Sequence, residues 1–223
     1  CRRKNSCDLC IMRIAVLVSG NGSNLQALIN AQHGKQLSGQ IVGVLSNKAE
    51  AYALRRAEDA NIATAVISHQ NFPNRESFDV AMHQQLLAWQ VDLVILAGFM
   101  RILTPEFVSK WQGKMLNIHP SLLPFYKGMN THQRVLNTGD RLHGCTVHFV
   151  TAELDAGQSI AQSVIQVSLQ DTAESLAQRV HELEHFIYPQ VAQWLCNGQL
   201  TWENGQAYFN QKLLEKPIQF AQF

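Results

Sequence analysis

The sequence lacks the features that mark membrane, nucleic-acid-binding and secreted proteins. Its longest nearly continuous apolar run, Leu93 to Met100, is far shorter than the roughly 18 residues that a membrane-spanning helix needs. Acidic and basic residues are interspersed and the formal net charge is only +1, which favours neither a nucleic-acid face nor a polybasic membrane patch. We therefore expect a soluble protein whose partners are small molecules, with no nucleic acid and no membrane among them.

Cysteine pairs that could build a metal site or a disulfide framework are also missing. Three of the five cysteines fall within the first ten residues, where Cys7 and Cys10 form a C-x-x-C pair. A zinc site needs about four ligands and no second pair completes the set, so we expect no metal. Cys145 and Cys196 alone predict no disulfide framework, which is consistent with a reducing cytoplasm. The opening, 1–11, lacks the apolar run of a secretory signal, and we expect it to be a disordered or non-native leader before a natural start at Met12.

From Arg13 onward, short β-rich runs alternate with longer helix-like segments. This order predicts crossover units that build a mainly parallel sheet. The runs are rich in Val, Ile and Leu, which indicates burial on both faces. We predict an α/β, Rossmann-like fold with helices on both faces of the sheet, in a single domain over 12–223, because no repeat or linker divides the chain. Strands are expected at 14–18, 40–45, 64–67, 93–97, 115–118, 143–150 and 158–167, and helices at 24–31, 51–60, 75–89, 105–111, 131–138 and 172–195. The tail after Gln199 shows no readable pattern.

A glycine-containing turn, Ser19-Gly20-Asn21-Gly22-Ser23-Asn24, joins the first expected strand to the first expected helix. Backbone amides at such a helix start, with the Ser23 hydroxyl, could hold one phosphate. The turn has neither the lysine of a P-loop nor the three-glycine spacing of a dinucleotide fingerprint, so a small phosphorylated metabolite fits better than a nucleotide triphosphate or NAD. An ordinary tight turn capped by Ser23 or Asn24 explains the loop equally well by itself.

Polar residues also follow later strands. Asn117 and His119 stand two apart at the end of an expected strand, so their side chains should project to the same side, at the edge where ligands bind in open parallel sheets. A histidine tied into a turn by backbone hydrogen bonds is the alternative. Asp155, beside Ala156 and Gly157, suits a turn, and a role in chemistry requires it to lie near His119, which spacing cannot establish.

Four segments together resemble the phosphoribosylglycinamide formyltransferase family. They are the GNGSN loop, LAGFMRIL at 96–103, NIHPSLLP at 117–124 and the segment 148–157, and the resemblance runs from about 12 to 202. It implies the formyltransferase fold and an enzyme of de novo purine biosynthesis. Such an enzyme transfers the formyl group of 10-formyltetrahydrofolate, its co-substrate, to the amine of glycinamide ribonucleotide. It is expected to be a cytoplasmic monomer or weak homodimer that uses no metal.

Carried over by position, the resemblance makes Asn117, His119 and Asp155 the catalytic residues. Residues implied to bind glycinamide ribonucleotide are Gly22, Ser23 and Asn24 at the phosphate and Glu184 at the ribose, with its neighbours His181, Glu182 and Leu183. Residues implied to bind the folate are Arg75, Met100, Arg101, Ile102, Leu103, Val150, Thr151, Ala152, Glu153 and Leu154. Plain core packing is the alternative for 100–103, and a solvated helix start is the alternative for Arg75. The loop after Pro124 departs from the family pattern at Phe125, Lys127, Met129 and Asn130.

The three implied catalytic residues suit the chemistry of formyl transfer. A neutral amine attacks the formyl carbon, an oxyanion develops on the tetrahedral intermediate, and the folate nitrogen leaves protonated. Asn117 could donate a hydrogen bond to the oxyanion, as could a protonated His119. Asp155 would favour the imidazolium and could take the amine proton through water. A formyltetrahydrofolate hydrolase, a non-catalytic folate-binding module and a dinucleotide-dependent oxidoreductase are the competing interpretations.

Overall fold

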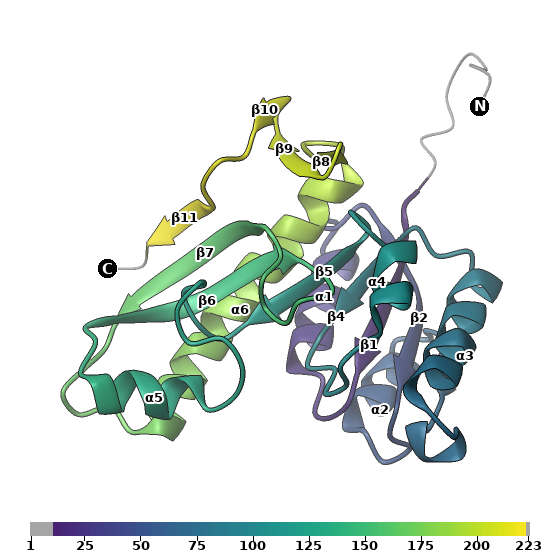
Figure 1. Cartoon of the computed structure of the whole chain (residues 1–223), viewed down its shortest axis with the longest axis horizontal. Helices are drawn as coiled ribbons and strands as arrows, with labels where there is room; N and C mark the ends of the chain where they lie inside the picture. The colour runs from purple at the N-terminus through teal and green to yellow at the C-terminus, as the bar shows by residue number, and fades with distance from the viewer. Residues whose placement is uncertain (1–10, 222–223) are drawn as a thin grey trace.

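The computed structural model describes residues 11–221, which form a large sheet flanked by helices and a small second sheet (Figure 1). The strands are β1 (Arg13–Val18), β2 (Gln40–Ser46), β3 (Thr64–Val66), β4 (Leu93–Leu96), β5 (Met115–His119), β6 (Leu142–Phe149), β7 (Ser159–Gln166), β8 (Leu200–Glu203), β9 (Gln206–Phe209), β10 (Lys212–Leu213) and β11 (Ile218–Ala221). The helices are α1 (Ser23–His33), α2 (Tyr52–Asp59), the 3-10 turn η1 (His69–Asn71), α3 (Arg75–Ala88), α4 (Pro105–Lys110), α5 (Thr131–Thr138) and α6 (Ala173–Cys196). The expected leader, except for its last residue, lies outside the described residues.

The large sheet has eight strands in the order β11-β7-β6-β5-β4-β1-β2-β3. All strands in the half of the sheet with the order β5-β4-β1-β2-β3 run parallel, as the alternation of strand and helix predicts. β6 is antiparallel to both β5 and β7, whereas β11 pairs in parallel with β7 at the edge. The sheet is therefore mixed but mostly parallel, and β5 stands where its parallel part meets its antiparallel part.

Alternate side chains of the buried strands enter two separate cores. In β1, Ile14, Val16 and Val18 belong to the core cluster that includes residues of α1, α2, α5 and α6, whereas Ala15 and Leu17 belong to the cluster that includes residues of α3 and α4. This is the period-two projection of a strand. Because apolar side chains leave on both sides, the sheet must be covered on both faces, as the sequence predicted.

The long helix α6 has the start that its sequence indicates. Thr172 and Ser175 form a reciprocal capping box, with each backbone N–H bonded to the other residue's hydroxyl. Further along the helix, the hydroxyl of Tyr188 donates to the carbonyl oxygens of Leu96 and Leu116, at 2.8 and 3.1 Å. This buried pair of bonds ties α6 to the backbones of β4 and β5. No described helix is long and apolar enough to cross a membrane.

The tail, which showed no readable pattern, contains four short strands. β8, β9 and β10 form the second sheet, at the end of α6 (Figure 1). β11 instead joins the edge of the large sheet. Strands of two to four residues are too short to show a period, and the pairing of β11 with β7 joins residues far apart in the sequence.

Candidate active site

The turn between β1 and α1 presents free backbone amides at its end. Gly22 has φ +76°, and a Cβ there would lie 2.5 Å from the Cβ of Ala53, so both conformation and space favour glycine. No side chain caps the start of α1, and the first amide to bond inside the helix is that of Gln26, to the Gly22 carbonyl at 2.9 Å. Within residues 11–221, the N–H groups of Ser23 and Asn24 have no acceptor. The turn therefore has the geometry that binds anions.

Arg56, which the sequence did not single out, supports this turn from α2. Its guanidinium donates to the backbone carbonyl and to the side-chain Oδ1 of Asn21, each at 2.9 Å, and to Gln26 at 3.1 Å. These bonds place a permanent positive charge beside the amides. Arg56 is far from the turn in the sequence, so no local pattern could have associated the two.

The turn also contacts the long helix α6. The side-chain amide of Asn24 donates to Glu184 Oε2 at 2.8 Å, and both side chains are buried. Burial raises the pKa of Glu184, while the hydrogen bond from Asn24 lowers it. Of the neighbours that were expected to bind substrate, Leu183 packs into the core, whereas His181 and Glu182 are exposed.

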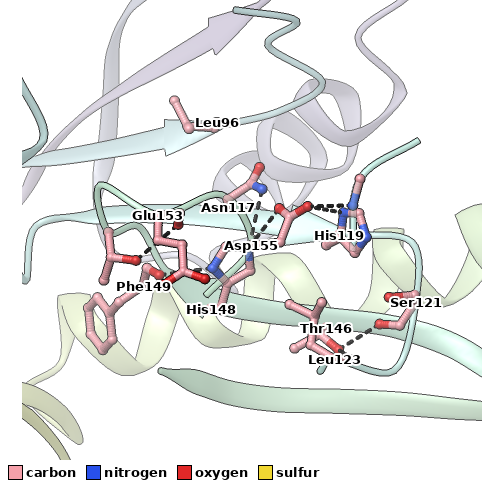
Figure 2. A network of polar contacts seen from close by, with 12 residues as sticks. Leu96, Asn117, His119, Ser121, Leu123, Thr146, His148, Phe149, Glu153 and Asp155 are labelled. Carbon is pink, nitrogen blue, oxygen red and sulfur yellow. Dashed lines mark hydrogen bonds and ion pairs between the residues drawn. The ribbon is translucent and has the colours of Figure 1, made fainter. Parts of the chain in front are cut away.

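Asn117, His119 and Asp155 meet at the end of β5 (Figure 2). Asn117 and His119 project to the same side of that strand, and Asp155 arrives from the turn that follows β6. His119 Nδ1 lies 3.4 Å from Asp155 Oδ2, with both side chains less than a tenth exposed. Asp155 has φ +49°, an unusual conformation that aspartate tolerates better than most residues. The contact that spacing could not establish is therefore present in the fold.

His148 joins this group from β6, directly opposite Asn117 in the ladder. Its Nδ1 lies 2.9 Å from the Phe149 carbonyl, which can only accept, so Nδ1 carries the proton. Nε2 is then left to accept from the Asn117 amide at 3.2 Å. Burial lowers the pKa of His148, which favours the neutral ring, although the bond to the Phe149 carbonyl and Asp155 at 3.8 Å oppose the shift. The sequence could place His148 on one face of a strand but not opposite Asn117, because that needs the register.

The loop after Pro124 closes over the histidine and the aspartate. The Tyr126 carbonyl lies 2.9 Å from His119 Nε2, and the Gly128 amide donates to Asp155 Oδ2 at 3.0 Å. Lys127, one of the departures from the family pattern, lies 3.6 Å from Glu153. The backbone of this loop therefore contributes to the site at positions where its side chains are atypical.

Most of the expected folate residues line one small pocket beside the three polar residues. The pocket encloses about 90 Å³. Its lining includes Asn117 and Asp155 together with Arg101, Ile102, Leu103, Val150, Thr151, Ala152, Glu153 and Leu154. Met100 and Arg75 are exposed and do not line it. Of the four side chains of 100–103, only that of Leu103 is buried, which argues against plain core packing for the segment.

The chain is similar to known proteins over nearly its whole length. Residues 12–192 match the model of the family described as formyl transferase. A phosphoribosylglycinamide formyltransferase from Haemophilus influenzae is 46% identical over 204 residues, which cover 92% of this chain and 96% of that protein. The chain belongs to the phosphoribosylglycinamide formyltransferase family.

Two further relatives show the range of this phosphoribosylglycinamide formyltransferase family. The structure of phosphoribosylglycinamide formyltransferase from Coxiella burnetii has a TM-score of 0.90 and 47% identity, over 94% of this chain and 99% of that one. A trifunctional purine biosynthetic protein adenosine-3 from Chironomus tentans is 50% identical over 83% of this chain, which spans only 14% of that protein. The predicted family, α/β fold and formyltransferase activity in purine biosynthesis are thereby confirmed.

Proposed function

We propose that Asn117, His119 and Asp155 catalyse transfer of the formyl group of 10-formyltetrahydrofolate to the amine of glycinamide ribonucleotide. The observation that carries this proposal is the meeting of three polar side chains, from two separate segments, beside the pocket that the expected folate residues line. Preorganised groups at the position where charge develops supply the largest share of catalysis in many enzymes.

The surroundings of His119 suit its charged form. One ring nitrogen faces the Tyr126 carbonyl and the other faces the Asp155 carboxylate, at 2.9 and 3.4 Å. Both partners can only accept hydrogen bonds, so a ring that carries two protons satisfies both. An imidazolium held in this way places a positive charge at the end of β5, where the oxyanion of the intermediate would develop.

The Asn117 amide supplies the hydrogen bond to that oxyanion. One of its two N–H groups is bonded to neutral His148, which fixes the rotation of the amide and leaves the other N–H for the substrate. A preorganised donor of this kind is worth about 3 to 4 kcal/mol. His148 is therefore a positioning residue in the proposed mechanism.

Asp155 accepts the proton that the attacking amine must lose. As the new C–N bond forms, the amine proton passes through water to the carboxylate. As the intermediate collapses, the bond to the folate nitrogen breaks and the protonated carboxylate returns the proton through water to that nitrogen, so the carboxylate is regenerated and no proton is consumed overall. The carboxylate is held by the Gly128 amide and by His119, and it reaches the pocket as one of its lining residues.

The two substrates would enter from different sides of this group. The phosphate would bind the amides at the start of α1, near Arg56, and the ribose hydroxyls would bind Glu184. The small pocket can hold only part of a folate, so the rest would extend over the exposed apolar side chains of Met100, Ile102 and Leu154. Arg75 would contact the outer end of the folate.

We further propose that residues 12–223 act as one domain, as a monomer or weak homodimer in the cytoplasm. One core cluster extends from Ile14 in β1 to Leu214 in the tail, which supports a single folding unit. The free thiols of Cys145 and Cys196 suit a reducing compartment.

A spectrophotometric assay for the deformylated folate, with and without glycinamide ribonucleotide, tests the proposed reaction. We expect product only when the ribonucleotide is present, together with one formylated ribonucleotide per folate. Formate release without the acceptor would indicate a hydrolase instead. Folate binding without turnover in either mixture would indicate a binding module.

A further inference from the structure

The backbone of the segment from Met100 to Thr104, called the folate segment below, makes few hydrogen bonds, although the side chain of Leu103 packs into the core. Within the described part of the chain, the N–H groups of Arg101, Ile102 and Leu103 make no hydrogen bond. The segment belongs to no helix or strand until α4 begins at Pro105. Apart from the packing of Leu103, the position of its backbone beside the pocket therefore depends on hydrogen bonds at its two ends.

One buried hydroxyl holds the first end. The Met100 N–H donates to Ser19 Oγ at 2.8 Å, and Ser19 in turn donates to Asn47 Oδ1 at 2.6 Å. Both side chains are buried, Ser19 just after β1 and Asn47 just after β2. Because Asn47 takes the hydroxyl proton, a lone pair of Ser19 is left pointing at Met100. Ser19 is also the first residue of the turn that leads to α1.

One buried carboxylate holds the other end. The Thr104 N–H donates to Asp79 Oδ2 at 2.7 Å, and Asp79, from α3, is only 3% exposed. Thr104 then caps α4 by accepting from the Phe107 amide at 3.2 Å. The other oxygen of Asp79 has no hydrogen-bond partner within residues 11–221. The bond to Thr104 is thus the main specific contact of a carboxylate that is costly to bury.

We propose that Ser19 and Asp79 are positioning residues that hold the folate segment against the folate, an inference that rests on the proposed function. Neither residue lines the pocket, yet each accepts from a backbone amide at one end of the segment. Since Arg101, Ile102 and Leu103 form one wall of the pocket, movement of either end would displace that wall. Ser19 additionally connects the folate segment to the turn from Ser19 to Asn24, called the phosphate turn below, whereas Asp79 contacts the folate segment alone.

Two substitutions of Asp79 separate a hydrogen-bond acceptor from a charge. Asp79→Asn keeps an oxygen that can accept from Thr104, whereas Asp79→Leu has a similar size and no acceptor. For Asp79→Leu we expect the KM for 10-formyltetrahydrofolate to rise about tenfold, with kcat and the KM for glycinamide ribonucleotide within about twofold of wild type. Asp79→Asn should restore the folate KM to within about twofold.

Ser19→Ala provides an independent test from the other end of the segment. Because Ser19 also begins the phosphate turn, we expect both KM values to rise in this variant, unlike in Asp79→Leu. Ser109→Ala removes an exposed hydroxyl from α4 and serves as the matched control with unchanged kinetics. Calorimetric titration with tetrahydrofolate measures folate binding without turnover. It should rank wild type and the variants in the same order as their KM values for the folate.

The outcomes distinguish this inference from the proposed function. If wild type transfers formyl groups normally and Asp79→Leu, folded by circular dichroism, keeps its folate KM, Asp79 has a structural role only and the inference is wrong. Should Asp79→Leu not fold, a normal folate KM in Ser19→Ala would overturn the inference. If wild type itself does not transfer the formyl group, the proposed function fails instead, and tetrahydrofolate binding still tests the two residues.

Discussion

The phosphate turn and the group at the end of β5 are built in opposite ways. The turn is one short stretch of the sequence, and the left-handed conformation of Gly22 leaves the amides at the start of α1 exposed. The group at β5 collects Asn117, His119, His148 and Asp155 from two paired strands and a loop. Within residues 11–221, the amides of Ser23 and Asn24 in the turn have no partners, whereas the side chains at β5 already contact one another.

This difference indicates how each region should respond to change. The amides of the turn belong to one short segment that lies apart from the group at β5, so damage to it should appear mainly in the affinity for one substrate. The group at β5 depends on the register of β5 and β6 and on the loop that carries Asp155. Damage there should appear in the chemical step.

The largest effect is expected at β5. His119→Ala removes the proposed imidazolium, and Asp155→Asn removes the proposed proton acceptor while it keeps a similar shape. We expect each to lower kcat at least about 10³-fold while glycinamide ribonucleotide still binds, because general acid–base and charge-stabilising groups are worth this much. Single-turnover rates and ribonucleotide titrations measure the two quantities separately.

His33→Ala, an exposed histidine on α1, is the matched control and should keep its activity. Near-normal turnover in either His119→Ala or Asp155→Asn would remove that residue from the chemistry. The chemical step would then depend on the remaining residues of the group, Asn117 and His148.

The sequence predicts local patterns in both regions, but it does not predict contacts between residues that are distant in the chain. Gly22 and Ser23 could be located as an anion-binding turn, and Asn117 and His119 could be placed on one side of a strand, because both patterns are local. The contact of Asp155 with His119 depended on a family resemblance. The fold then added what only pairing creates, such as the position of His148 opposite Asn117.

Other features were missed because their partners lie far away in the sequence. Arg56 reaches the phosphate turn from α2, and Asp79 reaches Thr104 from α3. The sequence of neither helix predicts these contacts, because a charged residue on a helix usually faces solvent. β11 is a strand because it pairs with β7, which lies far away in the sequence. Long, strongly periodic segments such as α6 were by contrast predicted within one residue at each end.

A smaller effect, confined to one substrate, is expected in the phosphate turn. Ser23→Asp places a negative charge where the phosphate would bind, at the positive end of α1. We expect the KM for glycinamide ribonucleotide to rise about a hundredfold, with the folate KM nearly unchanged, because repulsion replaces an attraction to the helix start. Ser109→Asp adds the same charge at an exposed position of α4 and should leave both KM values as they are. An unchanged ribonucleotide KM in Ser23→Asp would exclude the turn from the site.

The smallest effect concerns stability, and it tests whether the scaffold near β5 is the acid-sensitive part of the molecule. His143 on β6 is buried, and its Nε2 lies 3.0 Å from Nδ1 of His132 on α5. Burial, with the nearby His132 and His119, lowers the pKa of His143 from 6.5 to about 4. As the pH falls below 6.5, the unfolded chain takes up this proton before the folded one, so stability is lost between about pH 6.5 and 4.

At pH 5 the contribution of His143 to this loss should be about 2 kcal/mol. Urea unfolding at pH 8 and pH 5 measures it, and His143→Gln should show a correspondingly smaller difference between the two pH values than wild type. His33→Gln, on the exposed side of the helix that follows the phosphate turn, should retain the full wild-type difference. If His143→Gln and wild type lose the same free energy of unfolding, acid acts elsewhere. The acid sensitivity would then belong to other groups, such as His148 on the same strand, whose pKa is also lowered by burial.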